Sequence, residues 1–156
     1  MIAIQRPGQA PLEIDFILID FEGTLASDRH VHPKAKDKLN LLARRAKVRV
    51  LTIGEKTTAE EALKRVNAEI LYVNQGEASR EKLSLLRQLG PSRTVVIGNG
   101  FDDAPMMGEA GLSICVISRE GTSMEAMKNA HLVVSNVLDA LDFILKPLRQ
   151  KAALSE

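Results

Sequence analysis

Residues 17–25 read ILIDFEGTL, an apolar run that stops at two acids and a Gly-Thr pair. The run starts at Ile14 and has one polar interruption, which predicts a short buried strand over 14–19. Strand residues two positions apart share a face, so Asp20 and Glu22 could point into the same space. Ligands of open α/β sheets bind beyond the carboxyl ends of the strands. The stretch predicts a phosphate-binding turn at Gly23–Thr24 beside a cation that neutralises the acids, although such acids also suit a plain turn or helix cap.

Composition narrows the class of protein. A chain of 156 residues, 45% apolar and 26% charged, predicts a single domain over 1–156 with a real core. A net charge of +1 and 3% aromatic residues argue against a nucleic-acid partner. The single Cys115 lies in an apolar run and is expected to be a core residue in a reducing cytosol. Since no stretch is long enough to span a membrane and the first residues lack a secretory segment, we expect a cytoplasmic protein without a membrane partner.

Apolar strands alternate with amphipathic helices along the rest of the chain. Strands are predicted over 48–53, 69–73, 94–98, 112–117 and 132–134, and helices over 33–46, 57–67, 78–89, 103–110 and 136–145, with another short helix before the last strand. Pro7-Gly8 predicts an N-terminal β-hairpin, and Pro147 is expected to interrupt the chain before a basic tail. Strands without polar alternation indicate a parallel sheet covered on both faces, that is, a doubly wound three-layer α/β/α fold.

Two polar side chains stand where an apolar one would be ordinary. Thr52 ends the second core strand, where its hydroxyl could bind a phosphate oxygen, although threonine is also a common strand residue. Lys82 falls on the apolar stripe of the helix over 78–89. It either extends along its stem to solvent or reaches a cluster of acids that offsets its desolvation.

A glycine-flanked loop follows the strand over 94–98. Residues 97–107 read IGNGFDDAPMM, which brings Asn99, Asp102 and Asp103 together beside glycines that permit close backbone approach. Mg²⁺ takes oxygen ligands of this kind, usually one or two carboxylates with water and phosphate. One of the two acids is expected to cap the next helix instead.

Residues 20–24, Thr52, Lys82 and 98–103 together resemble the four motifs of the haloacid dehalogenase (HAD) superfamily in order and spacing. More narrowly, the chain is similar to the small soluble proteins related to the phosphorylation domain of P-type ATPases, through the segments 97–100, 109–114 and 138–142. The resemblance implies a HAD-like Rossmannoid fold and a phosphatase of phosphoric monoesters.

The resemblance also implies a role for each acid. Asp20 would attack phosphorus and form a covalent aspartyl phosphate. Mg²⁺ would be held by the Asp20 carboxylate, the Glu22 carbonyl and Asp103, with Asn99 as a further oxygen donor. Glu22, two residues after the nucleophile, would serve as general acid and base.

The same resemblance assigns the phosphate site and exposes two departures. Thr52 and Lys82 would bind the transferring phosphoryl group beside Gly23 and Thr24. Glu22 stands where HAD phosphatases usually have Asp, although the enolase-phosphatase branch also has Glu there. Many relatives have Asp where this chain has Asn99, which removes one negative charge and predicts weaker metal binding. We then expect Asp103 or Asp102 to be the main acidic ligand of that loop.

Motif spacing leaves no room for a cap domain. The intervals from Asp20 to Thr52 and from Thr52 to Lys82 hold only helices, a strand and loops, so the site is expected to be open or covered by another subunit of a homo-oligomer. An open site would admit a phosphorylated small molecule or a phosphoprotein. The loop over 27–33 could act as a small flap, and its histidines, His30 and His32, are more simply read as exposed.

Two further interpretations compete with a phosphatase. A HAD scaffold could bind metal and a phosphorylated ligand or protein partner with little or no turnover, because of Glu22 and Asn99. Turnover of an aryl phosphate separates this scaffold from an enzyme. A receiver-type domain shares the strand-end acid and the lysine, but it would not need the late Gly-Asn-Gly loop over 98–100.

Overall fold

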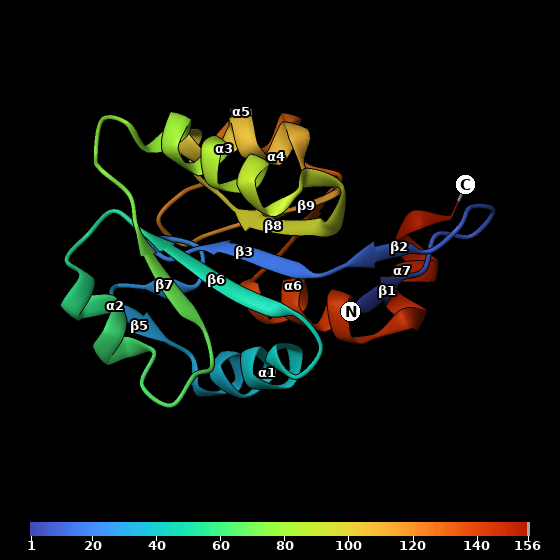
Figure 1. Cartoon of the computed structure of the whole chain (residues 1–156), viewed down its shortest axis with the longest axis horizontal. Helices are drawn as coiled ribbons and strands as arrows, with labels where there is room; N and C mark the ends of the chain where they lie inside the picture. Colours follow the sequence, from blue (N-terminus) through green and yellow to red (C-terminus); the bar gives the residue numbers. More distant parts are fainter. Residues whose placement is uncertain (156) are drawn as a thin grey trace.

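A six-stranded parallel sheet forms the centre of the computed structural model, which describes residues 1–155 (Figure 1). The strand order is β10-β9-β8-β3-β6-β7. The strands are β3 (Phe16–Asp20), β6 (Lys47–Thr52), β7 (Glu69–Tyr72), β8 (Thr94–Gly98), β9 (Leu112–Val116) and β10 (Leu132–Val134). The predicted doubly wound α/β fold is confirmed.

Helices cover both faces of the sheet. One face carries α3 (Ala78–Leu89), α4 (Ala104–Glu109) and α5 (Met124–Lys128), and the other carries α1 (Pro33–Ala43), α2 (Lys56–Ala62) and α6 (Val137–Leu145) (Figure 1). A separate apolar cluster fills each side: Leu39 packs in the cluster below β3, and Leu86 packs in the one above it. Removing these side chains from water drives the assembly of the three layers.

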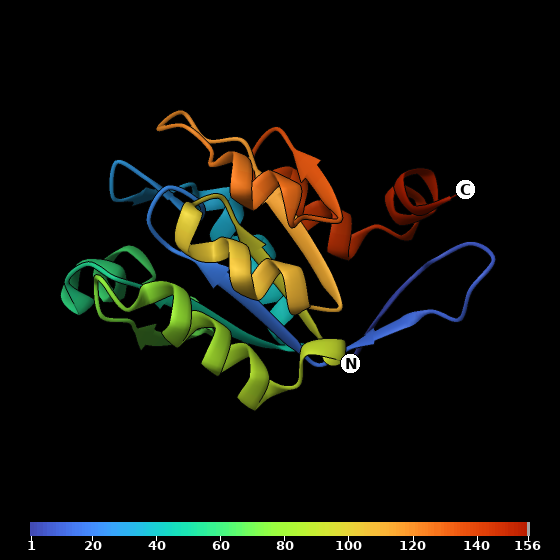
Figure 2. The same cartoon turned by 90° about the horizontal axis from the view of Figure 1, so that it is seen from above.

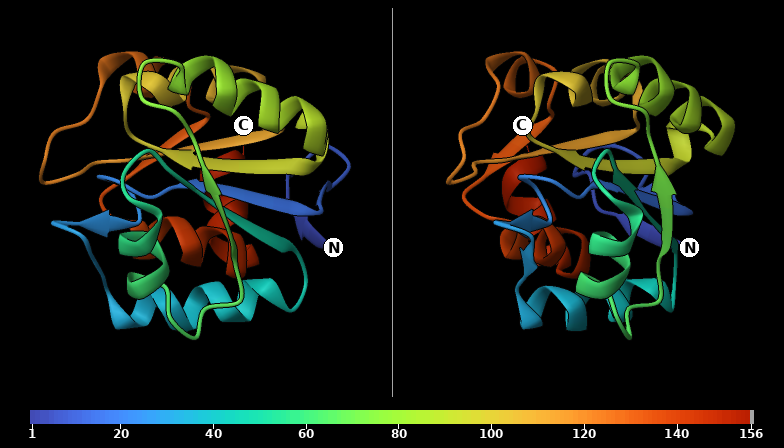
Figure 3. Two further views of the ribbon diagram at one scale, coloured as in Figure 1. Left: turned by 60° about the vertical axis from the view of Figure 1, so that its left-hand side comes forward. Right: turned by 90° about the vertical axis from the view of Figure 1, so that its left-hand side faces the viewer.

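The order of the strands places the site. β3 lies between β6 and β8, and the chain runs from β3 to β6 and β7 on one side and then to β8, β9 and β10 on the other. This reversal creates a topological switch point, the place where ligands of open α/β sheets bind. The right-hand view of Figure 3 looks onto the carboxyl ends of the strands at that edge. Asp20, the last residue of β3, therefore lies at the switch point.

The N-terminal hairpin is confirmed, and the strand predicted over 14–19 is present as β3 with different bounds, Phe16–Asp20. β1 (Ile2–Ile4) pairs antiparallel with β2 (Leu12–Ile14) and the hairpin projects from the body (Figure 2). The chain leaves this ladder at Asp15, whose N–H donates to the Arg93 carbonyl and whose carbonyl accepts from the Lys47 N–H. Because those bonds replace strand pairing with β1, the central strand begins only at Phe16.

Other elements also differ from the prediction, among them the helix expected over 33–46, which ends at Ala43. The helix expected over 57–67 spans only Lys56–Ala62, and Arg65 beyond it has φ 65°, a left-handed conformation that a helix cannot include. The basic tail after Pro147 is a helix, α7 (Pro147–Leu154), because proline at the first helical position suits the fixed φ of its ring. Gln150 fixes α7 by donating to the carbonyls of Phe143 and Ile144.

Short elements complete the chain. A small antiparallel pair, β4 (Ala26–Ser27) and β5 (His30–Val31), follows the end of β3, and 3₁₀ turns occupy η1 (Pro91–Arg93) and η2 (Phe101–Asp103). Between Asp20 and Lys82 the described chain holds only these hairpin strands, α1, β6, α2, β7 and α3, so no cap domain is inserted there. None of the helices described combines the length and the apolar character needed to cross a membrane.

Candidate active site

Every residue that the sequence singles out for chemistry lies at the carboxyl edge of the sheet. Asp20 ends β3, Thr52 ends β6, and the loop over 99–103 follows β8, the neighbour of β3. Lys82 comes from the second turn of α3. The parallel strands thus deliver groups from distant parts of the chain to one place, because their carboxyl ends share an edge.

Lys82 is a buried cation at the centre of the site. Its side chain is 1% exposed, and its Nζ lies 2.9 Å from Asp20 Oδ1, 2.8 Å from Asp102 Oδ2 and 2.8 Å from Asp103 Oδ1. The sequence left two alternatives for this residue, and the structure selects the acid cluster over an exposed position. Each hydrogen of the ammonium has its own carboxylate, which offsets the cost of removing the charge from water.

This cluster carries surplus negative charge. Three carboxylates surround one ammonium, a formal excess of two negative charges (three minus one). Burial alone would lower the pKa of Lys82, but Asp20, Asp103 and Asp102 raise it above its usual range and keep it charged. Burial, reinforced by the charge of Asp103, raises the pKa of Asp20 well above its ordinary value despite Lys82. One lysine does not neutralise the cluster, so a further cation would stabilise it.

Glycines make room for the acids of the loop after β8. Asp103 Oδ2 accepts from the backbone N–H groups of Asn99 at 3.0 Å and Gly100 at 2.9 Å. A Cβ at Gly98 would lie 2.7 Å from the Asp103 carboxylate, and one at Gly100 would lie 2.7 Å from Asp102 Oδ1. Such distances are shorter than packed atoms tolerate, so the Gly-Asn-Gly sequence follows from the close approach of these carboxylates.

Asn99 joins three loops. Its Oδ1 accepts from Thr24 Oγ1 at 2.8 Å, and its Nδ2 donates to the carbonyls of Gly23 at 2.9 Å and Gly121 at 3.3 Å. An aspartate at this position could accept but not donate, so it would lose both carbonyl contacts. The departure from Asp therefore has a structural reason in this chain.

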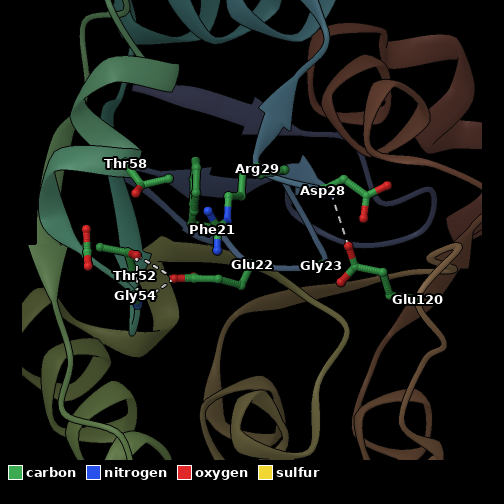
Figure 4. A pocket seen from close by; sticks show the side chains of 11 residues that line it. Phe21, Glu22, Gly23, Asp28, Arg29, Thr52, Gly54, Thr58 and Glu120 are labelled. Carbon is green, nitrogen blue, oxygen red and sulfur yellow. Dashed lines mark hydrogen bonds between the residues drawn. The ribbon is translucent and has the colours of Figure 1, made fainter.

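Glu22 and Asp20 have different partners. Glu22 Oε1 accepts from Thr52 Oγ1 and from the Gly54 N–H at 2.9 Å (Figure 4), and it also accepts from the Ile53 N–H at 2.9 Å. Asp20 instead faces Lys82, with Thr24 Oγ1 3.3 Å from its second oxygen. The premise that both acids belong to the strand is therefore wrong, because β3 ends at Asp20 and Glu22 lies beyond it, and the two acids contact different groups.

A cavity of about 650 Å³ opens beside Glu22 and Thr52 (Figure 4). Asp28 and Arg29, at the tip of the β4–β5 hairpin, and Glu120 also line it. The hairpin is tied to the far loop by the Asp28 N–H, which donates to Glu120 Oε1 at 3.1 Å. Sequence reasoning placed a flap over 27–33, which includes Arg29, but missed Glu120, since nothing local connects residues so far apart in the chain.

The two histidines of the flap do not line this cavity. His32 is the N-cap of α1, and its Nδ1 accepts from the Lys34 N–H at 3.0 Å. Its position is therefore explained by helix capping, which satisfies a backbone donor that the helix leaves unpaired.

The site residues suit a hard divalent cation by donor chemistry and charge. Within residues 1–155 no group of three His, Cys, Asp or Glu side chains forms a ready-made metal cluster, because Lys82 holds the point where the acids converge. The available donors near Asp20 are all oxygens, including the Asn99 amide oxygen and a remaining lone pair on Asp103 Oδ1. A charge of +2 would match the formal excess of two negative charges.

Comparison with solved structures identifies the fold. A HAD family protein from Streptomyces avermitilis superposes with a TM-score of 0.69 at 17% identity, covering 88% of this chain and 88% of that one. The 3-deoxy-D-manno-octulosonate 8-phosphate phosphatase of Moraxella catarrhalis, solved with magnesium, phosphate and the sugar acid, gives 0.72 at 16% identity, with 87% and 88% covered. The cobalt-bound enzyme of that name from Haemophilus influenzae gives 0.70 at 17% identity, with 90% and 91% covered.

Sequence comparison finds a short relative. No family model matches the chain. The uncharacterized protein MJ0073 of Methanocaldococcus jannaschii is 36% identical over 81 residues, which cover 49% of this chain and 87% of that protein. The chain therefore has the fold of the HAD superfamily and belongs to one family with MJ0073.

Proposed function

We propose that the protein is a Mg²⁺-dependent phosphohydrolase that acts through a covalent aspartyl phosphate on Asp20. One observation carries this proposal. The carboxylate of Asp20, at the switch point, is held by the buried Lys82. Nearby, the hydroxyl of Thr52 and the N–H groups that follow it converge on one point and can bind an anion. The phosphatase names of two neighbours with the same fold support the reaction class.

The first chemical step forms the phosphoenzyme. An Asp20 oxygen attacks phosphorus, the bond from phosphorus to the leaving oxygen breaks, and Glu22 gives its proton to the departing alkoxide. Lys82 orients Asp20 and, with Thr52, binds the phosphoryl oxygens, while Gly23 and Thr24 contribute the neighbouring turn. These groups position the reactants and offset charge, which is most of what phosphoryl transfer requires.

The second step releases phosphate. Glu22, now ionised, takes a proton from water, whose oxygen attacks the phosphorus of the aspartyl phosphate and returns the Asp20 carboxylate. Mg²⁺, when bound by Asp20, the Glu22 carbonyl, Asp103 and Asn99, supplies charge neutralisation in both steps. The substrate class that fits is a phosphorylated small molecule, with an open site that also admits a phosphoprotein.

Asp20→Asn tests the nucleophile. With Mg²⁺ and beryllium fluoride, the wild type should form a phosphoaspartate mimic on Asp20, visible by fluorine NMR, and the variant should not. Hydrolysis of an aryl phosphate should fall by roughly 10³-fold or more. Undiminished hydrolysis in Asp20→Asn would remove Asp20 from the mechanism.

Glu22→Gln tests the general acid and base. Gln keeps the size of the side chain but exchanges no proton in the needed range, so turnover should fall by roughly 10²–10⁴-fold. Phosphoenzyme should accumulate in rapid-quench experiments, because the attacking water loses its base. A variant as active as the wild type would show that Glu22 is a bystander.

The alternative is a scaffold that binds a phosphorylated ligand without turning it over. The position of Asn99 favours this alternative, because its Oδ1 already accepts a hydrogen bond from Thr24 and is less available to coordinate a metal. On this reading the purified wild type should bind phosphate with Mg²⁺ but show no steady turnover of an aryl phosphate. Steady turnover that Asp20→Asn abolishes would exclude the scaffold.

A further inference from the structure

One oxygen of Glu22 fills a cradle of three donors. The Thr52 hydroxyl and the Gly54 N–H converge on Oε1 (Figure 4), and the N–H of the intervening Ile53 donates to the same oxygen. Consecutive backbone N–H groups beside a hydroxyl at a strand end form a concave anion site. Nothing in this donor set is specific for a carboxylate, so it would accept a phosphoryl oxygen equally well.

The local geometry keeps the cradle open for an anion. A Cβ at Gly54 would lie 3.3 Å from Glu22 Oε1 and 3.8 Å from Thr52 Oγ1, which would crowd whatever occupies the cradle. Glycine thus provides the space above the strand end. The cradle also borders the cavity, since Glu22, Thr52 and Gly54 are among its lining residues.

In the part of the chain that the structure describes, only one of the two carboxylate oxygens of Glu22 is hydrogen-bonded. Glu22 Oε2 is buried and has no hydrogen-bond partner among the residues described. A desolvated carboxylate oxygen without a donor is unfavourable, so the bound position of Glu22 is weaker than its three donors suggest. A phosphoryl group whose other oxygens face the cavity could use the same donors without that penalty.

We propose that the Glu22 carboxylate is an internal competitor of the phosphoryl group for the Thr52–Ile53–Gly54 cradle. Substrate then binds only when Glu22 swings out, and this movement carries Glu22 from the cradle toward the position of a general acid and base. The extra methylene of Glu relative to Asp gives the side chain the reach to occupy the cradle. The group that Glu22 competes with is a phosphoryl group, so the inference rests on the proposed function.

The experiment measures binding of inorganic phosphate with Mg²⁺ by calorimetry and by the amide shifts of Ile53 and Gly54 in NMR spectra. If Glu22 holds the cradle for most of the time, Glu22→Ala should bind phosphate about 10- to 100-fold more tightly than the wild type. Phosphate added to Glu22→Ala should move both amide signals toward their wild-type positions. Glu22→Asp, which keeps the charge but shortens the side chain, should show an intermediate gain.

Glu120→Ala is the matched control, because it removes one negative charge from the same cavity without touching the cradle. It should change phosphate affinity by less than about twofold if the contact rather than the field is responsible. Equal gains in phosphate affinity in Glu22→Ala and Glu120→Ala would overturn the inference. So would a Gly54 amide signal that does not shift when phosphate is added to Glu22→Ala. This experiment measures phosphate binding and not turnover, so tighter phosphate binding by Glu22→Ala would support the inference even if Asp20 proves not to be the nucleophile. Conversely, if Asp20 is the nucleophile but Glu22→Ala binds phosphate no more tightly than the wild type, the phosphatase proposal stands and the competition is excluded.

Discussion

Two partly buried charge clusters in this protein have opposite compositions. At the carboxyl edge of the sheet, Lys82 is surrounded by three carboxylates. Against α1, α6 and α7, Asp142 is surrounded by three cations, with Lys38 Nζ 2.6 Å, Lys146 Nζ 3.4 Å and Arg149 3.8 Å from its oxygens. The first cluster has excess negative charge and the second has excess positive charge.

The pKa shifts follow from these compositions. Burial and Asp103 raise the pKa of Asp20, whereas Asp142 keeps a lowered pKa because Lys38 and Lys146 outweigh its desolvation. Asp142 is thus an ordinary structural ion pair that joins helices. The Asp20 cluster keeps an excess of negative charge by itself, as the proposed cation and phosphate site would require.

Lys82→Met should give the largest effect on stability. The substitution leaves three carboxylates at a buried site without their cation, and removing one partner of such a group costs about 3–5 kcal/mol. Urea unfolding at neutral pH measures the free energy. Lys38→Met is the matched control in the other cluster, and it should cost only about 1 kcal/mol because Asp142 keeps two cations. Equal losses would show that the two clusters do not differ as described.

Mg²⁺ should stabilise the acid-rich cluster alone. At a hundredfold excess over its dissociation constant, a ligand of the folded state adds about 2.7 kcal/mol to the unfolding free energy. Asp103→Ala should abolish this gain, Asp102→Ala should reduce it, and Asp142→Asn should leave it unchanged. The measurement is thermal unfolding at constant ionic strength, and full stabilisation of Asp103→Ala with none in Asp102→Ala would reverse the assignment within the pair.

Replacing one aspartate of each cluster by the uncharged asparagine should change the free energy of unfolding in opposite directions. Asp142→Asn removes the acceptor of charged hydrogen bonds and should destabilise the protein by about 1–2 kcal/mol. Asp20→Asn in metal-free protein removes one of three mutually repelling carboxylates, so it should be neutral or stabilising by up to about 1 kcal/mol. Chemical unfolding of both variants at neutral pH checks the signs, and a large loss in Asp20→Asn would mean that Lys82 needs all three acids.

Acidification should produce the smallest effects, again of opposite sign. The folded pKa of Asp142 lies below its ordinary value of 3.8, so its contribution is present above that value and is lost as the pH falls through the folded pKa. The folded pKa of Asp20 lies above its ordinary value, so metal-free wild type should gain stability over Asp20→Asn as the pH falls from neutral toward about 4. The Asp142 difference should be about 1 kcal/mol or less because that cluster is partly exposed, and parallel trends for the two pairs would contradict the comparison.

Much of the site could be predicted because a parallel sheet brings the residues that follow its strands to one edge. Asp20, Thr52 and the loop over 99–103 each follow an apolar strand, and in a parallel sheet such residues must meet at one edge. The helix over 78–89 and the strand over 94–98 have the predicted bounds, because their apolar spacing and the closing Gly90 leave little choice. The residue roles at this edge remain predictions.

What the sequence determined by itself was the class of fold and the set of groups that gather at the switch point, because strand ends and apolar periodicity are local signals. Only the tertiary structure decided how those groups pair. It broke the first strand at Asp15, paired Glu22 with Thr52 and Asp20 with Lys82, and placed Asn99 where its amide joins separate loops. Hydrogen-bond partners are chosen by distance and direction in three dimensions, and residues 30 to 75 positions apart leave no local trace of that choice.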